Sequence, residues 1–309
     1  MMISSPSIIL HTPQLGENIG SAARIMLNFG LTDLRLVAPR DGWPNAAADP
    51  LSAGAFEAGV EVRVFDTIEA AIAEQKPLVY FPAGEKYRID RDVIISGAVR
   101  TFFGGSPKTR ISNGIGEKED TSSGPSLVLG SDLPLFEFDL LDTAHLRHDH
   151  PTELIIRHCR TDHISAGEKC GPLFIEDSEG MFRFSKHQRV WGRQLNPETK
   201  GVPEIINDGG QLWILGLKTE YLSTKIENRN GARTEILGGL MYPVHPVTDE
   251  SLPMFLNIDS DMSLVHGVSV YGKNHKIYIK ETRGTETREY REWHWENGRP
   301  ITNLYRAAK

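Results

Sequence analysis

The sequence is poor in the features that mark several common classes of protein. Its 309 residues include only two cysteines, Cys159 and Cys170, too few for a disulfide framework or a zinc site. No apolar run approaches the ~18 residues that a membrane-spanning helix needs. The start, MMISSPSIILHTP, lacks the basic region and long apolar core of a secretion signal. These absences predict a cytoplasmic protein with free thiols and no membrane contact.

Positive charge is scarce as well. The chain has 34 Lys and Arg against 41 Asp and Glu, a net charge of −7. Non-specific binding of nucleic acid depends on cations that neutralise phosphates, so this balance argues against broad binding of RNA or DNA. The hydrophobic content of 39% is ordinary for a globular protein. The length suits two domains or one long array of repeats.

What the sequence does contain is a repeated strand unit. The run LWILGLKTE at 212–220 is answered by TEILGGLMY at 234–242, and an Asn-Gly turn signal lies between them. Similar units on both sides align at separations of 22, 23 and 28 residues, through Leu195, Leu217, Leu240 and Val268. A period in this range is typical of a solenoid, whose units bury their apolar sides only against their neighbours. We therefore expect a mainly β fold, a parallel β-solenoid, with a β-sandwich of short strands as the alternative.

The first 75 residues follow a different pattern. A strand over 7–11 precedes helix-forming residues at 14–29, and Gly30 is well placed as a left-handed cap. A strand over 34–39 comes next, so the order strand, helix, strand begins a parallel α/β sheet. Three more elements are expected: a helix over 45–59, a strand over 62–65 and a helix over 68–74.

Part of this segment resembles the first motif of the SpoU-type RNA ribose methyltransferases, which have a knotted α/β fold. The likeness covers about residues 7–74 and is carried by Asn18-x-Gly20-x-x-x-Arg24, Asn28-Phe29-Gly30-Leu31 and Leu36-Val37-x-Pro39. It implies an RNA substrate, an S-adenosylmethionine cofactor, and Arg24 near the reacting ribose hydroxyl with Asn18 beside it. A guanidinium suits this role because it can hold a phosphate bidentately. The same spacing also fits Asn18 as a helix cap with Arg24 exposed.

The remaining motifs of that family are missing. Its cofactor pocket uses a Ser-Leu-Asn loop, which does not occur here, and a glycine loop whose nearest mimic at 127–131 lacks the glutamate. Residues 1–75 also hold four basic residues against nine acidic ones, whereas RNA-binding domains gather Lys and Arg. We therefore predict an incomplete α/β unit with no bound cofactor. S-adenosylmethionine and RNA are expected only under the methyltransferase interpretation.

The composition changes at 75–77, which predicts one unit over 1–75 and a second over 76–309. Strands and glycines alternate from 78 to 105, and the tract 106–125 predicts an exposed loop. The second unit resembles the right-handed β-helix proteins of the pectate-lyase-like superfamily. The likeness is carried by VYFPAG…Y at 79–87, W…QLNPE at 191–198 and NDGG…WxxGLKTE at 207–220.

The first of these motifs usually lies well inside such helices, so the first coils and their cap are missing. An uncapped solenoid exposes an apolar cross-section. Either the α/β unit covers that end, or the chain is a fusion of two truncated pieces.

The second resemblance implies a carbohydrate-associated protein with a polysaccharide partner, acting as a hydrolase or lyase or lacking activity. Glycoside hydrolysis needs two carboxylates that face one groove, and the candidates are Asp177, Asp208 and Glu220, with Asp162 nearby. A lyase would need a base and a cation, for which the candidates are Arg157, Arg160 and Arg193. Acidic residues at turns commonly bond the backbone instead, so a structural or adhesive solenoid without catalysis is a third possibility.

Two further groups of residues, histidines and tryptophans, are of types that bind metals or sugars. The histidines at 145, 148, 150, 158 and 163 lack the spacing of metal ligands on a helix, and we predict no metal. Tryptophan rings stack on sugar faces, but Trp213 lies in an apolar run and is predicted to be core. Trp293 and Trp295 alternate in sequence and are expected to share one strand face that closes the C-terminal end.

Overall fold

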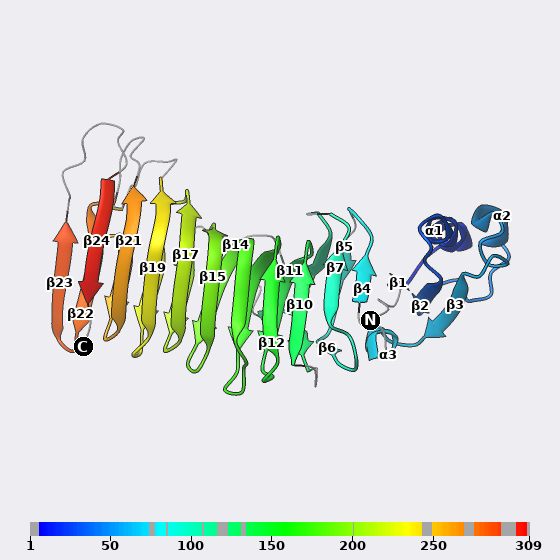
Figure 1. The fold of residues 1–309 in the computed structure, drawn as a ribbon, viewed down its shortest axis with the longest axis horizontal. Helices are drawn as coiled ribbons and strands as arrows, with labels where there is room; N and C mark the ends of the chain where they lie inside the picture. Colours follow the sequence, from blue (N-terminus) through cyan, green and yellow to red (C-terminus); the bar gives the residue numbers. More distant parts are fainter. Residues whose placement is uncertain are drawn as a thin grey trace.

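A computed structural model gives the fold of the chain. It describes residues 6–73, 78–84, 86–106, 108–115, 123–130, 134–199, 201–242, 249–268, 275–291 and 301–307. The expected boundary at 75–77 and the pair Trp293 and Trp295 lie outside the described residues. The protein is mostly β, with 52% strand and 9% helix, and its strands form a long, mostly parallel sheet (Figure 1). No helix in the described ranges is long and apolar enough to cross a membrane.

The N-terminal segment forms a small parallel sheet with helices on both faces. Its elements are β1 (Ser7–His11), α1 (Gly16–Asn28), β2 (Asp33–Val37), α2 (Asp49–Ser52), β3 (Glu61–Phe65) and α3 (Ile68–Ala73). β2 pairs in parallel with both β1 and β3. Ile19 and Met26 of α1 share a core with Leu36, whereas Ile72 of α3 packs with Ile9 on the other face. The order strand, helix, strand expected here is confirmed.

Two local expectations in this segment differ from the structure. The helix expected over 45–59 is reduced to the four residues of α2, because Ala53 (φ 48°) and Gly54 (φ 81°) turn the backbone into the left-handed region. At the start of α1 the N-cap position belongs to Leu15, which makes no side-chain capping bond. Asn18 therefore does not cap α1. Gly30, with φ 69°, follows the helix in the left-handed conformation expected of it.

The long sheet consists of three parallel ladders of strands. Between β4 and β24 the strands are β4 (Leu78–Phe81), β5 (Lys86–Arg88), β6 (Val93–Ile95), β7 (Thr101–Gly104), β8 (Arg110–Ser112), β9 (Leu127–Leu129), β10 (Leu135–Asp139), β11 (Asp142–His148), β12 (Glu153–Arg157), β13 (Arg160–Ala166), β14 (Leu173–Ser185), β15 (Arg189–Pro197), β16 (Ile205–Asp208), β17 (Gln211–Thr219), β18 (Ile226–Arg229), β19 (Arg233–Met241), β20 (Pro253–Ile258), β21 (Asp261–Val268), β22 (Ile277–Arg283), β23 (Glu286–Arg291) and β24 (Ile301–Ala307). Each strand pairs with the equivalent strand one circuit later, as in β15–β17–β19 and β16–β18–β20. Antiparallel pairs occur at the C-terminal end, at β21–β24 and β22–β23. Parallel ladders of this extent rule out the β-sandwich alternative, which is built from antiparallel sheets.

The α/β segment covers the first end of the long sheet. β1 pairs in parallel with β4, through Ser7 with Val79 and Ile8 with Tyr80. Ile72 of α3 belongs to the same core cluster as Val79 and Val99. Figure 1 shows the two parts joined end to end. β1 therefore extends the parallel pairing of the long sheet into the α/β segment.

Residues with a left-handed backbone, at the bend where each strand turns a corner, explain why glycine recurs within the repeated strand unit. In β17, Leu212 and Ile214 are buried before Gly216, and Leu217 is buried after it. The positive φ of Gly216 (86°) turns the chain at the corner and shifts the alternation of inward and outward residues by one. Equivalent corners on neighbouring rungs use Asp177 (44°), Gln194 (52°) and Gly238 (81°).

The register corrects the repeat alignment at two of its three steps. Leu195 pairs with Leu217 as expected, but Leu217 pairs with Gly239 rather than with Leu240. Leu240 is 41% exposed, and Met241 takes the buried position. On the following rung, after a register shift between Leu237 and Leu240, Leu240 pairs with Gly267 rather than with Val268. The two adjacent glycines, Gly238 and Gly239, explain the misalignment. Gly239, and not Leu240 after it, takes the position equivalent to Leu217.

Asparagine side chains form a buried ladder along the third face of the stack. Asn207, Asn228 and Asn257 occupy equivalent positions on successive rungs, and each is 0% exposed. Asn228 Nδ2 donates to Asn257 Oδ1 (3.1 Å) and to the carbonyl of Asp261 (2.9 Å). Its Oδ1 accepts from the Thr234 hydroxyl at 2.8 Å. We call these three residues the asparagine ladder. It satisfies backbone groups at the turns that would otherwise be buried without a partner.

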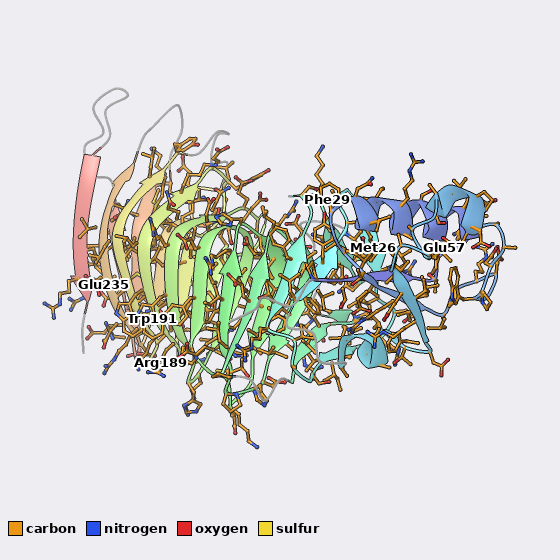
Figure 2. The ribbon with its side chains drawn as sticks, turned by 45° about the vertical axis from the view of Figure 1, so that its right-hand side comes forward. Met26, Phe29, Glu57, Arg189, Trp191 and Glu235 are labelled. Carbon is orange, nitrogen blue, oxygen red and sulfur yellow. The ribbon has the colours of Figure 1, made fainter. Side chains whose placement is uncertain are left out.

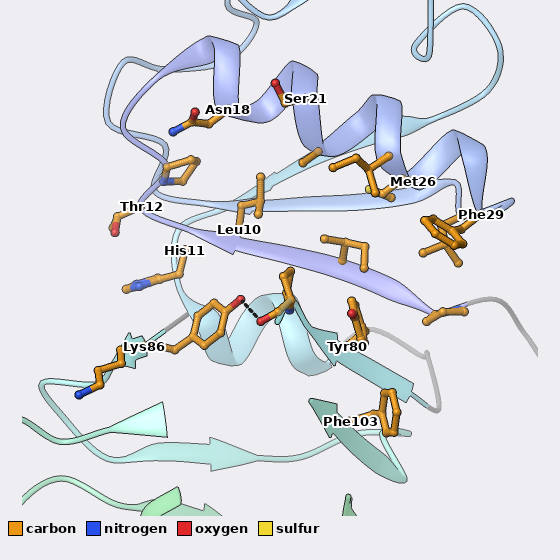
Figure 3. Close-up of a pocket in the computed structure, with 18 of the residues that line it drawn as sticks. Leu10, His11, Thr12, Asn18, Ser21, Met26, Phe29, Tyr80, Lys86 and Phe103 are labelled. Carbon is orange, nitrogen blue, oxygen red and sulfur yellow. Dashed lines mark hydrogen bonds between the residues drawn. The ribbon is translucent and has the colours of Figure 1, made fainter. Parts of the chain in front are cut away.

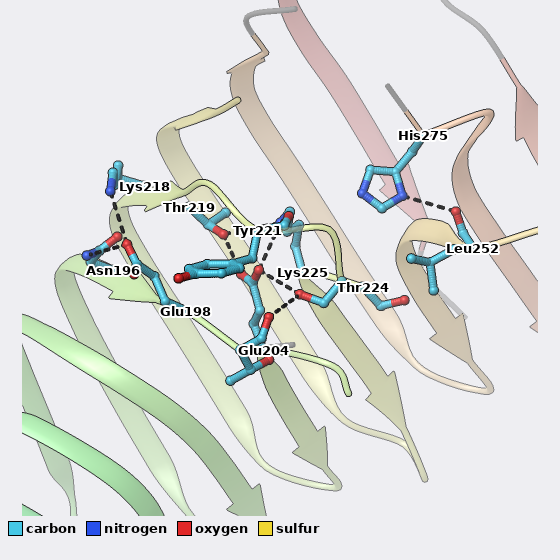
Figure 4. A network of polar contacts seen from close by, with 12 residues as sticks. Asn196, Glu198, Glu204, Lys218, Thr219, Tyr221, Thr224, Lys225, Leu252 and His275 are labelled. Atoms are coloured by element: carbon cyan, nitrogen blue, oxygen red, sulfur yellow. Dashed lines mark hydrogen bonds and ion pairs between the residues drawn. The ribbon is translucent and has the colours of Figure 1, made fainter. Parts of the chain in front are cut away.

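An ion pair is fully buried inside the same coils. Lys225 Nζ lies 2.8 Å from Glu204 Oε1, and both side chains are 0% exposed (Figure 4). The hydroxyls of Thr219 and Ser223 donate to the Glu204 carboxylate at 2.6 and 2.7 Å. Lys225 also donates to the carbonyl of Tyr221. Burial raises the pKa of Glu204 to about 7 and lowers the pKa of Lys225.

Candidate functional site

A large cavity lies where the α/β segment meets the long sheet. It has a volume of about 1410 Å³ and is bounded by α1, β1, β4, β5 and β7. Its walls are largely apolar, and we call it the junction cavity. Figure 3 places Asn18, Met26 and Phe29 along the face of α1 that looks onto Leu10 and Tyr80. This volume exceeds the roughly 300–1,000 Å³ of typical small-molecule sites, so an extended ligand fits better than a compact one.

Polar and aromatic side chains surround the cavity mouth. Asn18 is exposed on the first turns of α1. Lys86 and Arg88 of β5 are exposed at the opposite wall. The rings of Tyr80 and Phe103 stack with centroids 6.0 Å apart and line the floor between them. The cavity therefore presents an amide, two cations and two rings in one place.

The structure separates the two residues suggested by the methyltransferase motif. Asn18 lines the junction cavity, whereas Arg24 is exposed and does not line it. Six residues separate them on a helix of 3.6 residues per turn, so their side chains leave α1 in directions about 120° apart. Phe29 of the same motif lines the cavity and is 77% exposed.

The segment most similar to the family's glycine loop does not form a loop in the described residues. The nearest mimic of the family's glycine loop forms strand β9, which pairs with β6 and β11. Leu127 and Leu129 of β9 are buried in the main core, at 2% and 1% exposure. This segment is part of the stack and makes no cofactor loop beside α1.

The three carboxylates suggested for sugar chemistry do not converge. Asp177 occupies a left-handed corner, and Glu220 lies two rungs further on and four positions past that corner. At about 4.8 Å per rung and about 3.3 Å per residue, this separation exceeds the roughly 5–9.5 Å of a glycosidase pair. Asp208 is on another ladder, where it binds Arg229 Nε (2.9 Å) and Asn230 Nδ2 (2.6 Å).

Glu220 is instead held by contacts with two neighbouring side chains. It forms an ion pair with Lys218 and accepts a hydrogen bond from the Tyr242 hydroxyl at 2.7 Å. The hydrogen bond from Lys218 lowers the pKa of Glu220 most, and the hydrogen bond from Tyr242 lowers it further. A carboxylate held in its ionised form suits a structural pair better than a proton donor.

A different acidic pair is assembled where β8, β11 and β13 lie side by side. Asp162 is 3% exposed and forms ion pairs with Arg110 and, at 3.4 Å, with Arg160 Nε. The Oδ1 atom of Asp142 accepts the backbone N–H of Arg160 at 2.7 Å. Burial raises the pKa of Asp142 to about 6, and the charge of Asp162 contributes to the rise. We call these four residues the Asp142–Asp162 cluster.

Sequence reasoning found only half of this cluster. Asp162 and Arg160 were candidates, but Arg110 fell in the tract expected to be an exposed loop, and it is 3% exposed on β8. Asp142 carried no signal because nothing in its neighbourhood in sequence marks a site. Arg110 and Asp162 are 52 residues apart and meet only through the pairing of β8 with β11 and of β11 with β13.

The remaining sequence candidates have local partners. Arg157 forms an ion pair with Glu137, and Arg193 lies 3.2 Å from Glu176. Trp213, predicted to be core, lies half-buried on the outer face and stacks on Trp191 at 5.2 Å. Within the described ranges, no group of three His, Cys, Asp or Glu side chains is placed to hold a metal ion.

Comparison with solved structures gives a partial likeness. No protein-family model and no curated protein matches the chain. Among solved structures, TrmJ from Z. mobilis ZM4 is similar to 33% of this chain, with 44% sequence identity and a TM-score of 0.26. The likeness covers 50% of the TrmJ chain, so this chain spans about half the length of that neighbour.

Proposed function

We propose that the junction cavity binds a segment of RNA and that Asn18 contacts its ribose. The observation that carries this proposal is the position of Asn18. This motif residue faces an extended cavity whose other walls supply the rings of Tyr80 and Phe103 and the cations Lys86 and Arg88. The resemblance of residues 7–74 to SpoU-type enzymes supports an RNA ligand.

Each group in the cavity has a role in such binding. The Asn18 amide both donates and accepts hydrogen bonds, as a ribose 2′-hydroxyl does. Aromatic rings stack on bases without regard to sequence, and lysine and arginine pair with phosphates. With a net charge of −7 on the chain, contact with RNA is confined to this cavity. The proposed activity is binding of RNA, and methyl transfer would require in addition a site for S-adenosylmethionine.

Binding of a fluorescein-labelled ten-nucleotide RNA, followed by anisotropy, tests this proposal. Asn18→Ala should raise the Kd about fivefold, the equivalent of one hydrogen bond of about 1 kcal/mol. Arg24→Ala on the other face of α1 is the matched control and should leave the Kd unchanged. The DNA of the same sequence should bind more weakly because it lacks the 2′-hydroxyl.

Two outcomes would contradict the proposal. Equal binding of RNA and DNA would remove the role of the ribose hydroxyl. A loss of affinity in Arg24→Ala but not in Asn18→Ala would move the site to the other helix face. In calorimetry, S-adenosylmethionine should give no saturable heat, and a one-site isotherm would show that a cofactor pocket exists.

A second candidate function is favoured by the Asp142–Asp162 cluster. We propose that residues 76–309 form a right-handed β-helix, distinct from the α/β unit of residues 1–75, and that its outer face binds a polysaccharide. The parallel ladders and the left-handed corners support a β-helix. Sugar hydrolysis needs one protonated and one ionised carboxylate. Burial raises the pKa of Asp142 to about 6, whereas Asp162 pairs with Arg110 and Arg160 and, at 3% exposure, must be uncovered before a sugar can reach it.

Release of reducing ends from a panel of acidic and neutral polysaccharides tests this second function. Asp142→Asn and Asp162→Asn should each lower the rate by at least about 100-fold, the usual contribution of a general acid or base. Asp177→Asn and Asp208→Asn, which change corner and turn residues, are the matched controls. Because Asp142 is protonated below its pKa of about 6, the rate should fall as the pH rises above about 6. Activity that survives both cluster variants would refute this site.

A further inference from the structure

An aromatic stack on the outer face of the coils ends beside an acidic residue. Phe174, Trp191 and Trp213 occupy equivalent positions on three successive rungs. Their ring centroids are 5.0 and 5.2 Å apart, and both interplanar angles are 13°. On the next rung the equivalent residue is Glu235. The stack therefore ends at Trp213, which uses one ring face on Trp191 and turns the other toward Glu235.

The stack forms one side of a pocket of about 430 Å³ that reaches its Trp213 end. All three rings line the pocket, and at that end Leu215, Glu235 and Leu237 join them. The two leucines point outward and are 60% and 49% exposed, an unusual placement for large apolar side chains on a solvent-facing strand. Their side chains supply apolar walls beside the indole ring. The pocket thus combines an aromatic face, an aliphatic wall and a carboxylate.

Both arginines that line the pocket are already paired with carboxylates. Arg193 at the other end is paired with Glu176 at 3.2 Å, and Arg157 is paired with Glu137. Glu235 makes no hydrogen bond or ion pair with any part of the chain that the structure describes. A ligand that reaches the pocket therefore meets a negative charge next to an electron-rich ring face.

The protein already places a cation against this stack. The guanidinium carbon of Arg189 lies 5.9 Å from the centroid of the Trp191 ring. Figure 2 shows Arg189, Trp191 and Glu235 on the same side of the coils. Because Phe174 and Trp213 cover both faces of the Trp191 ring, Arg189 lies at its edge. A cation gains more over an open indole face, where the ring quadrupole is negative, and the gain increases where water is excluded. Trp213 has such an outer face with a carboxylate beside it.

We propose that this pocket binds an organic cation, a quaternary ammonium or guanidinium group, held between the Trp213 ring and the Glu235 carboxylate. The leucine walls contact the methyl or methylene groups of the ligand. A neutral sugar is a poorer fit, because the three rings cover one another and leave only the two outer faces of the stack, one on Phe174 and one on Trp213. This site is independent of the RNA and polysaccharide proposals.

Calorimetric titration of the full chain with choline, and separately with N-acetyl-arginine amide, tests the proposal. At least one of the two should give a saturable one-site isotherm that weakens as salt rises. The neutral isostere of choline, 3,3-dimethylbutan-1-ol, should give none. Glu235→Gln keeps the shape of the side chain and should raise the Kd about tenfold. Glu286→Gln makes the same charge change on the exposed β22–β23 hairpin and should have no effect.

Trp213→Leu should also abolish the isotherm, with circular dichroism as a check on folding. Because Glu235→Gln changes only a surface group, it tests the proposal even if Trp213→Leu unfolds. Absence of saturable heat with both cations would overturn the proposal. So would equal binding of the neutral isostere, or an unchanged Kd in Glu235→Gln. Binding of trigalacturonate that depends on Trp213 would assign the pocket to sugar instead.

Discussion

Lys225→Met should lower the free energy of unfolding by about 3–5 kcal/mol, the cost of leaving one partner of a buried ion pair without the other. The Glu204 carboxylate would keep only the hydroxyls of Thr219 and Ser223, and the carbonyl of Tyr221 would lose its donor. Both charged side chains are 0% exposed, so water cannot replace the lost ammonium group. Urea unfolding followed by circular dichroism measures the change.

A second variant and a matched control sharpen this experiment. Replacing both partners, as in Glu204→Leu with Lys225→Met, should recover at least half of the loss, because no unpaired charge remains. Lys218→Met removes an ammonium group that is 38% exposed and paired with Glu198 and Glu220, and it should cost less than about 1 kcal/mol. If Lys225→Met costs no more than Lys218→Met, the buried pair does not contribute as the structure indicates.

Asn228→Leu should destabilise the protein by about 3 kcal/mol or more. The leucine fills a similar volume but makes none of the hydrogen bonds of the asparagine ladder. The hydroxyl of Thr234, the Oδ1 of Asn257 and the carbonyl of Asp261 would each lose a partner. Leaving a buried polar group unsatisfied costs about 1–3 kcal/mol. The midpoint and slope of urea unfolding measure the effect.

The matched control for the ladder is Gln211→Leu. Gln211 carries the same amide but is exposed on β17, so its replacement should change stability by less than about 0.5 kcal/mol. An Asn228→Leu variant as stable as Gln211→Leu would show that neighbouring groups re-pair without the ladder.

The local sequence pattern was sufficient to predict the first three elements of the fold. The strand over 7–11, the helix that became α1 and the strand that became β2 follow from short-range periodicity and from Gly30. The helix expected over 45–59 failed because small residues do not distinguish a helix from a series of turns. At Ala53 and Gly54 the backbone takes the left-handed conformation, which composition alone did not reveal.

The repeat was visible in the sequence, but its register was not. The spacing from Leu195 to Leu217 matches the paired strands, whereas Leu240 was placed one residue out of register. A one-residue slip moves every side chain to the opposite face. The same ambiguity affected Trp213, whose apolar neighbours suggested the core although its own position alternates outward. The ladder of Asn207, Asn228 and Asn257 did have a signal, since each precedes a turn by one or two residues.

The sequence by itself determined that the chain is mainly β with a short α/β start, because hydrophobic periodicity and turn residues act over a few positions. It also marked Asn18, which lines the junction cavity. Only the tertiary structure separated Asn18 from Arg24, dispersed Asp177, Asp208 and Glu220, and brought Arg110 to Asp162 across 52 residues. The physical reason is that parallel pairing joins residues about one circuit or more apart, and the register that selects those partners depends on bulges and left-handed corners along the whole stack.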